Sequence, residues 1–264
     1  MYKKLLVTAL IIATLLFLVP VARAITFGQP DGDGHPNVGA MIVQEPDGVK
    51  YLYCSGTLIA PKVFLTAAHC TAAAAAYGAD PHDAYVTFDP VWDAKAKLYR
   101  GTYKLNSNYG HDSHDSHDVA VIILDKPVKD KHIKPATLPT DGLLSEMEKD
   151  HELKGQQFVT VGYGTLRDDK TGGPHALDGY GVRYFAEQTF LSLKPYWLQI
   201  SMNPSTGSGG TCYGDSGGPH FLGDSNMVVS LTVTGDAWCR ATDVTYRLDT
   251  DSARSYLKDF VTLP

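Results

Sequence analysis

Short runs of apolar and β-branched residues, separated by turn-forming residues, follow one another through most of this 264-residue chain. Such runs are typical of β-strands. Breakers rich in glycine and proline lie between them, as in Pro46-Asp47-Gly48 and Thr171-Gly172-Gly173-Pro174. Many short strands joined by such turns predict an all-β fold, either a barrel or a sandwich. The predicted strands are Val38–Val43, Tyr51–Ile59, Val63–Ala67, Tyr85–Phe88, Val119–Leu124, Phe158–Tyr163, Tyr184–Leu193, Trp197–Met202 and Met227–Thr234.

Two segments have helical character. Ala67–Ala76 is rich in alanine, the best helix former. Ser252–Val261 carries apolar residues at the spacing of one helix face, which predicts an amphipathic helix near the C-terminus. The polar, charged segment Thr140–Lys154 is the expected linker between two halves of the chain.

Residues 1–24 have the pattern of a secretory signal peptide. Lys3 and Lys4 precede the apolar run Leu5–Val19, and Ala22-Arg23-Ala24 forms an A-x-A cleavage site. The alternative is an uncleaved membrane anchor, but the run is shorter than the roughly 20 residues that span a bilayer. We therefore expect cleavage, secretion, and no membrane attachment afterwards.

The composition suits a globular domain rather than a nucleic-acid-binding protein. Hydrophobic residues make up 44% of the chain and charged residues 20%. The formal net charge is −6, and no basic cluster follows the N-terminus. Nucleic-acid binding would call for a basic patch, so we expect none.

Four cysteines, an even number in a chain expected to be exported, predict disulfides. They are Cys54, Cys70, Cys212 and Cys239, and their spacing alone leaves three pairings open. No C-x-x-C pair is present, which argues against a metal site.

A serine, a histidine and an aspartate stand in settings that favour nucleophilic catalysis. Ser216 lies in the glycine-rich segment Gly210–Pro219, where the chain can turn tightly and bring backbone N–H groups close to a substrate. A serine needs a base to take its proton. His69 is the candidate base, and Asp118, just before an apolar run, is the candidate carboxylate that orients it.

The choice of Asp118 comes from a tract in which His-Asp pairs recur between His111 and Asp118. This tract could hold a metal ion, but the simpler interpretation is a polar loop that ends at Asp118. A buried strand follows Asp118 at once, so its carboxylate should enter the core. Asp112 and Asp115 are expected in the exposed part of the loop.

Taken in order, Thr66-Ala67-Ala68-His69-Cys70, Asp118 and Gly214–Pro219 resemble the motifs of the trypsin/chymotrypsin family of serine peptidases. Weaker matches occur at Val161–Gly164 and Pro135–Pro139, and the resemblance covers nearly all of the chain after the first two dozen residues. It implies two packed antiparallel β-barrels and a short C-terminal helix. The peptidase domain would span 25–264, with barrels at about 25–140 and 154–250 and the helix at about 251–262.

The resemblance also assigns roles. Ser216 would be the nucleophile, His69 the general base and Asp118 its orienting partner, with the backbone N–H groups of Gly214 and Ser216 as the oxyanion hole. The implied disulfides are Cys54–Cys70 and Cys212–Cys239. The implied protein is a secreted, monomeric serine endopeptidase that forms an acyl-enzyme on protein or peptide substrates and needs no cofactor or metal. The alternative is an inactive relative that serves as a binding module.

Primary specificity is predicted from residues near Ser216. Gly210 stands where trypsin has the aspartate that selects Lys or Arg, and Thr232 would narrow the pocket. We therefore expect small or medium uncharged side chains at the cleaved position, unless Asp243 points inward and accepts basic ones. Ser230 would bond the catalytic aspartate, and the Ser230–Thr232 backbone, with Leu231 at its centre, would pair with the substrate.

The N-terminus of the expected mature chain suggests a mode of activation. Family members usually expose an Ile-Val-Gly-Gly-like terminus whose ammonium pairs with the aspartate before the nucleophile. Here Ile25-Thr26-Phe27-Gly28 follows the signal cleavage site directly. We expect the Ile25 ammonium to pair with Asp215, without a separate zymogen step.

Overall fold

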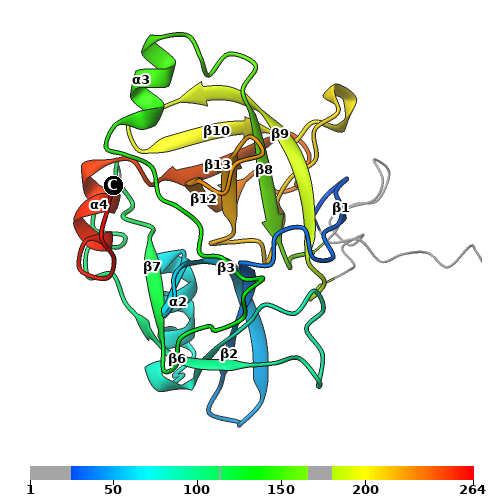
Figure 1. Ribbon diagram of the computed structural model, residues 1–264, viewed down its shortest axis with the longest axis vertical. Helices are drawn as coiled ribbons and strands as arrows, with labels where there is room; N and C mark the ends of the chain where they lie inside the picture. The colour runs from blue at the N-terminus through cyan, green and yellow to red at the C-terminus, as the bar shows by residue number, and fades with distance from the viewer. Residues whose placement is uncertain (1–24, 113, 166–179) are drawn as a thin grey trace, which may run out of the picture.

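The computed structural model describes residues 25–112, 114–165 and 180–264 (Figure 1). The predicted signal peptide 1–24 and the turn Thr171–Pro174 lie outside these ranges. The strands are β1 (Gln29–Pro30), β2 (Val38–Gln44), β3 (Lys50–Ala60), β4 (Val63–Thr66), β5 (Ala84–Thr87), β6 (Tyr99–Lys104), β7 (Ala120–Leu124), β8 (Gln157–Gly162), β9 (Tyr184–Leu193), β10 (Trp197–Ser201), β11 (Pro219–Leu222), β12 (Val228–Gly235) and β13 (Thr242–Arg247). The α-helices are α2 (Ala68–Ala76), α3 (Leu143–Lys149) and α4 (Asp251–Leu257), and short 3-10 turns cover Pro81–Asp83 and Pro204–Thr206.

The strands form two antiparallel barrels, which confirms the predicted architecture. The first closes in the order β2-β3-β4-β7-β6-β5. The second runs β9-β10-β13-β12-β11-β8 and closes because β8 also pairs with β9, while β1 adds to the outside of β9. Closure leaves no free sheet edge within either barrel. Among the described residues, no helix is long and apolar enough to cross a membrane.

Every predicted strand and both predicted helices are present, but other elements were missed. β1, β6, β11, β13 and α3 are additional. β6 and β13 contain charged residues and no continuous apolar run, and α3 lies inside the segment expected to be a plain linker. α4 begins one residue before the prediction and ends at Leu257.

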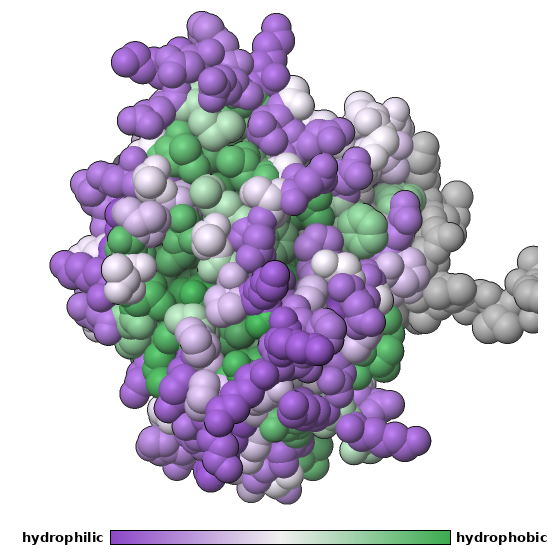
Figure 2. All heavy atoms as spheres, in the orientation of Figure 1, coloured by the Kyte–Doolittle hydropathy of each residue, from purple (hydrophilic) through white to green (hydrophobic). Residues whose placement is uncertain are grey.

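The hydrophobic core continues across the junction of the two barrels. One buried cluster contains Val38 and Val119 from the first half of the chain and Val161 and Phe221 from the second. On the face shown in Figure 2, hydrophilic residues dominate the outline and hydrophobic residues fill much of the centre. Packing between the barrels therefore fixes how the loops at their junction face one another.

The N-terminal segment crosses from the second barrel to the first. Thr26 pairs with Gly210 through two backbone hydrogen bonds of 2.8 and 2.9 Å, and Gln29 pairs with Phe185 of β9. The chain then enters β2 of the first barrel. Residues 25–30 therefore belong spatially to the second barrel.

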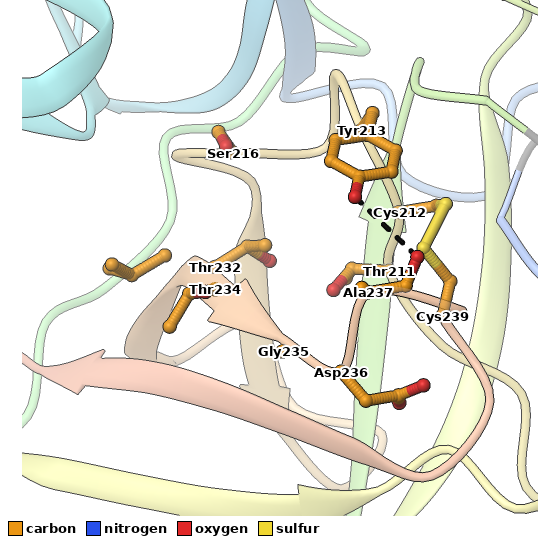
Figure 3. A pocket seen from close by; sticks show the side chains of 11 residues that line it. Thr211, Cys212, Tyr213, Ser216, Thr232, Thr234, Gly235, Asp236, Ala237 and Cys239 are labelled. Carbon is orange, nitrogen blue, oxygen red and sulfur yellow. Dashed lines mark hydrogen bonds between the residues drawn. A yellow bond between two sulfur atoms is a disulfide. The ribbon is translucent and has the colours of Figure 1, made fainter. Parts of the chain in front are cut away.

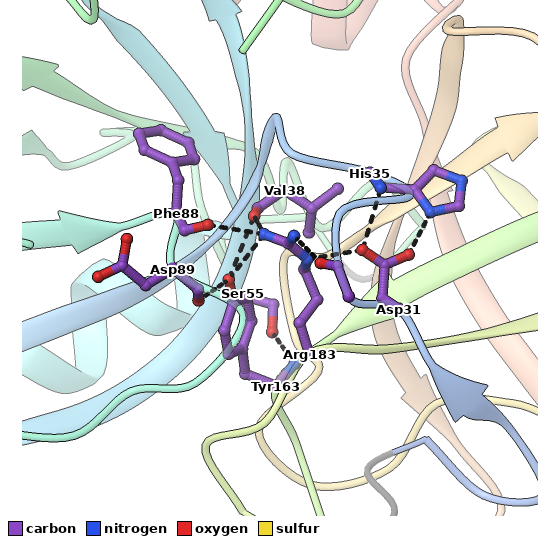
Figure 4. A network of polar contacts seen from close by, with 9 residues as sticks. Asp31, His35, Val38, Ser55, Phe88, Asp89, Tyr163 and Arg183 are labelled. Carbon is purple, nitrogen blue, oxygen red and sulfur yellow. Dashed lines mark hydrogen bonds and ion pairs between the residues drawn. The ribbon is translucent and has the colours of Figure 1, made fainter. Parts of the chain in front are cut away.

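A fully buried arginine, Arg183, joins this segment to both barrels (Figure 4). Its Nε donates to Asp31 Oδ2 at 2.7 Å, and its Nη2 donates to the carbonyl of Gly32. Its Nη1 donates to the carbonyls of Val38 at 3.0 Å and Phe88 at 2.8 Å. One guanidinium thus satisfies acceptors from the N-terminal segment and from the first barrel, while its own backbone leads into β9.

The partners of Arg183 are themselves fully bonded. Asp31 also accepts hydrogen bonds from the backbone N–H and the ring of His35. Burial acts to raise the pKa of Asp31, but His35 and Arg183 together hold it below its ordinary value. The Tyr163 hydroxyl accepts from Arg183 at 3.1 Å and donates to the carbonyl of Asp89 at 2.8 Å. A buried charge in such a setting is stabilised only while every partner is in place.

We predict that Arg183→Met lowers the free energy of unfolding by about 3–5 kcal/mol, because it leaves the Asp31 charge buried without the guanidinium that bonds to it. Urea unfolding followed by circular dichroism measures the change. Arg100→Gln is the control, since Arg100 pairs with Asp83 at 3.0 Å on the surface. Exposed pairs contribute at most about 1 kcal/mol, so equal losses in the two variants would contradict the prediction.

Candidate active site

Asp118 holds both the backbone and the ring of His69. His69 lies in the first turn of α2, directly after β4, where helix N–H groups lack partners within the helix. Asp118 Oδ1 accepts the His69 backbone N–H at 2.8 Å, and Oδ2 lies 2.8 Å from His69 Nδ1. Asp118 is 2% exposed. The carboxylate therefore caps the helix and directs the Nε2 side of the imidazole away from itself.

The loop before β7 delivers Asp118 to this position. Asn106 Nδ2 donates to the carbonyls on both sides of Asp118, those of His117 at 3.0 Å and Val119 at 3.1 Å. His117 has a φ of 51°, a left-handed conformation that histidine adopts more readily than most residues. The turn at His117 and the clamp from Asn106 together aim the carboxylate at α2.

Within the His-Asp tract, Asp112 is exposed as predicted, whereas the prediction for Asp115 was wrong. Asp115 is 3% exposed and accepts a 2.7 Å hydrogen bond from the hydroxyl of Tyr246. Tyr246 and His117 both bond to Ser252 at the start of α4. Asp115 is buried because a tertiary contact with Tyr246 of β13, which is itself bonded to Ser252 of α4, gives its carboxylate a partner that the local sequence does not reveal.

The nucleophile loop between Cys212 and β11 is anchored by the opposite barrel. Ser55 in β3 donates its backbone N–H to the carbonyl of Ser216 at 2.9 Å and its hydroxyl to the carbonyl of Gly214 at 3.1 Å. Gly214 has a φ of 96°, and a Cβ there would lie 2.6 Å from a ring carbon of Tyr180, so only glycine fits. Ser55 was not predicted as a site residue.

The backbone N–H groups of Gly214 and Ser216 donate to no acceptor within the described residues. They remain available to a ligand, as an oxyanion hole requires. Asp118 is hydrogen-bonded to His69, and no described hydrogen bond reaches the Oγ atom of Ser216. Contacts of this kind often tighten only when a substrate is bound.

Both disulfides have the pairing that the resemblance implied. Cys54–Cys70 ties β3 to α2 beside His69, and Cys212–Cys239 ties the nucleophile loop to the turn before β13. Among the described residues, Cys54, His69 and Cys70 are close enough to suggest a metal site. Both sulfurs are bonded to each other, so they are not available as thiolate ligands.

A cavity of about 300 Å³ opens beside Ser216 (Figure 3). The nucleophile loop forms one wall, and the end of β12 with the turn after it forms the other. The Tyr213 hydroxyl reaches across to the carbonyl of Ala237 at 3.5 Å. The lining residues are Thr211, Cys212, Tyr213, Ser216, Thr232, Val233, Thr234, Gly235, Asp236, Ala237 and Cys239.

The Trypsin family model matches residues 29–253, which include every element of both barrels and the loops that carry His69, Asp118 and Ser216. The chain belongs to the trypsin family. Its fold agrees with solved structures of that family. It matches the structure of HL collagenase with a TM-score of 0.65 at 19% identity, covering 89% of this chain and 97% of the other.

Curated relatives of this trypsin-family chain are distant in sequence. Kallikrein 1-related peptidase b27 of Mus musculus is 26% identical over 193 residues, which cover 64% of this chain and 65% of the mouse protein. The match thus spans just under two thirds of that relative's length. Trypsin of Saccharopolyspora erythraea is 26% identical over 213 residues, covering 78% of this chain and 84% of the bacterial protein.

The trypsin-family pocket is built from a later part of β12 than the sequence suggested. Ser230 and Leu231 are fully buried and do not line the cavity, and the Ser230 hydroxyl bonds to Thr245 Oγ1 at 2.8 Å rather than to Asp118. The Thr232 N–H donates to the Gly218 carbonyl and its C=O accepts from Gly217, so its backbone is occupied. On the side of β12 that faces away from β13, residues 233–235 have no strand partner among the described residues. Cys239, which is held in place by its disulfide, is nearer in sequence to residues 233–235 than Ser216 is. Counting back from Cys239 therefore locates the cavity residues of β12 better than counting forward from Ser216.

Gly210 also lies away from the cavity. It pairs with Thr26, and a Cβ built on it would lie 2.1 Å from Met202 Cγ. The buried Met202 side chain thus fills the space into which an aspartate at this position would project. Asp243 is buried behind the cavity wall, where its Oδ2 accepts a 2.7 Å hydrogen bond from Thr211.

Asp215, the aspartate before the nucleophile, is fully buried and bonded only to neutral groups within the described residues. Its oxygens accept backbone N–H bonds of 2.8 Å from Gly164 and from Cys212. Burial raises the pKa of Asp215 to about 7, although these two N–H groups act to lower it. Ile25 is also fully buried, on the same barrel, and its nitrogen belongs to a peptide bond in the full chain. No contact between Ile25 and Asp215 is described.

Proposed function

We propose that this chain is a secreted serine endopeptidase that acts as a monomer on proteins or peptides through a triad of His69, Asp118 and Ser216. The Asp118–His69 pair is the observation that carries the proposal, since one carboxylate fixes both the position and the tautomer of the imidazole. Membership of the trypsin family supports the reaction class, and two disulfides agree with an oxidising, extracellular location. The proposal includes no cofactor or metal, no nucleic-acid partner, and no membrane attachment once residues 1–24 are removed.

The proposed chemistry follows from the residues in place. His69 takes the proton of Ser216 as Oγ attacks the scissile carbonyl, and then gives it to the leaving amine. Asp118 accepts a hydrogen bond from the Nδ1–H of His69 and stabilises the imidazolium without taking its proton. The N–H groups of Gly214 and Ser216 bind the oxyanion of the tetrahedral intermediate. Water then hydrolyses the acyl-enzyme on Ser216 by the same steps.

Primary specificity for small or medium uncharged residues is part of the proposal, but the reasons differ from those that the sequence suggested. Gly210 contributes only because it places no carboxylate near the cavity. Thr232 lies at the cavity wall but is 4% exposed, and Gly235 stands nearer the open end of β12. A peptide-library cleavage profile should therefore favour uncharged residues, and one dominated by Lys or Arg would reject this part of the proposal.

An inactive binding module is the second candidate. It is favoured by the fact that no described hydrogen bond reaches Ser216 Oγ. One of the matched structures is human heparin binding protein, with a TM-score of 0.64 and 17% identity, covering 90% of this chain and 96% of that one. At that identity the likeness shows the fold alone.

Ser216→Ala and His69→Ala should each lower kcat/KM for a peptide substrate by about 10⁴-fold or more while the melting temperature stays unchanged, because each is needed by one catalytic unit. A fluorophosphonate probe should label the wild type and not Ser216→Ala. Ser225→Ala, which alters an exposed serine, is the control and should retain full activity. An unlabelled, inactive wild type that starts at Ile25 would favour the binding module.

The Ile25 ammonium is proposed to pair with Asp215 after signal cleavage. With a peptide nitrogen at Ile25, the raised pKa of Asp215 contributes stability that is full below its unfolded value near 3.8 and lost as pH rises through about 7. An ammonium partner lowers the pKa of Asp215 and removes this loss. Its own pKa rises above about 7.7–8.0, so the pairing weakens only at higher pH.

The test compares protein that starts at Ile25 with protein carrying an extra N-terminal methionine or an acetyl group. Thermal unfolding between pH 4 and 8 should show the loss of stability only in the two blocked forms, and peptidase activity should be highest in the free form. Asp215→Asn in a blocked form should abolish the pH dependence. Equal activity and equal pH profiles in all three forms would refute the pairing.

A further inference from the structure

A histidine and an aspartate lie together behind the cavity beside Ser216, and the proposed mechanism uses neither. His220 in β11 and Asp243 in β13 are both fully buried. His220 Nε2 lies 3.7 Å from Asp243 Oδ2. Buried ionisable pairs of this kind often serve a function, although structural pairs also occur.

Two threonines connect this pair to the cavity. Thr211 lines the cavity and donates its hydroxyl to Asp243 Oδ2 at 2.7 Å. Thr232 lines it as well, and its Oγ1 lies 3.0 Å from His220 Nε2. Figure 3 shows both threonines among the residues that line the cavity. A substrate side chain in the cavity is thus one residue away from each member of the pair.

Among the described residues, no fixed cation cancels the charge of the pair. Asp243 Oδ2 also accepts from Gln188 Nε2 at 3.0 Å, which is neutral, and Oδ1 has no hydrogen-bond partner in the described structure. The cavity lining contains Asp236 and no lysine or arginine. The net charge behind the wall therefore depends on whether His220 is protonated.

The surroundings of His220 contain one charged group that acts on it. Burial lowers the pKa of His220, and the negative charge of Asp243 opposes that shift. The neighbouring strands present Thr160 from β8 and Ser230 from β12 opposite His220, and neither titrates. Asp215 lies farther off and interacts with Asp243.

We propose that the His220–Asp243 pair sets the charge that a substrate side chain meets in the primary cavity, so that protonation of His220 makes cleavage after cationic side chains less favourable relative to cleavage after uncharged ones. With His220 neutral, the pair carries one negative charge. With His220 protonated, the pair is neutral. The wall is a low-dielectric medium, so a charge a few ångströms away changes binding measurably. This proposal rests on the peptidase function and adds a specificity-determining pair to it.

The experiment measures kcat/KM for two peptides that differ only in lysine or norleucine at the cleaved position, from pH 4.5 to 8. Dividing one value by the other cancels the titration of His69, which affects both substrates alike. The lysine ammonium stays charged throughout. The lysine/norleucine ratio should fall by about three- to tenfold as pH drops through the pKa of His220, below about 6.5.

Variants assign the effect to the pair. His220→Gln should make the ratio independent of pH, and Asp243→Asn should lower it to the acid-limit value at every pH. His132→Gln, which alters an exposed histidine, is the matched control and should leave the wild-type curve unchanged. If His220→Gln does not fold, the wild-type curve and the Asp243→Asn variant still test the proposal.

A ratio that does not change with pH in the wild type overturns the proposal, as does a pH dependence that survives in Asp243→Asn. Binding of the same two peptides to Ser216→Ala, followed by calorimetry, gives the ratio of dissociation constants without catalysis. Absence of hydrolysis with a pH-dependent binding ratio would reject the peptidase function and keep the charged cavity. Hydrolysis with a ratio that does not change with pH would support the peptidase function and reject the charged cavity.

Discussion

The Arg183 guanidinium is the contact on which the relative placement of the two barrels depends. It bonds to Asp31 in the N-terminal segment and to carbonyls at Val38 and Phe88 of the first barrel, while its own backbone begins β9. Apolar packing across the junction is not directional, whereas a planar guanidinium donates its hydrogen bonds only along fixed directions. The loops that form the site therefore face one another in the orientation that the hydrogen bonds of the buried Arg183 guanidinium allow.

Each proposed catalytic group is held by contacts that run between elements rather than within one. Asp118 caps α2, which also orients His69, and Asn106 clamps the backbone on both sides of Asp118. Ser55 reaches from the first barrel to the carbonyls of Gly214 and Ser216 in the second. The nucleophile loop is therefore fixed by the opposite barrel, and a change in barrel packing would directly affect the proposed oxyanion hole.

The primary cavity shows how strand register decides which side chains a substrate meets. Thr232 is the last residue of β12 whose backbone bonds to the nucleophile loop, and the register with β13 shifts directly after it. On the side that faces away from β13, residues 233–235 consequently have no strand partner among the described residues. Behind them, polar side chains occupy the barrel interior, where His220 and Asp243 contact the two cavity threonines. The same barrel thus supplies both the shape of the cavity and a titratable charge behind its wall.

The sequence by itself determined the strands with continuous apolar runs, the helix after β4 and the family, and the family resemblance implied the disulfide partners. The sequence also predicts His69, Asp118 and Ser216 as the catalytic residues. These depend on local patterns and on motifs whose residues are adjacent in the chain. It did not determine the burial of Asp115, the roles of Ser55 and Arg183, or the residues of β12 that face the cavity. Tertiary structure decided those, because each depends on hydrogen bonds between strands far apart in sequence, and a shift of one or two residues in register changes which side chains meet.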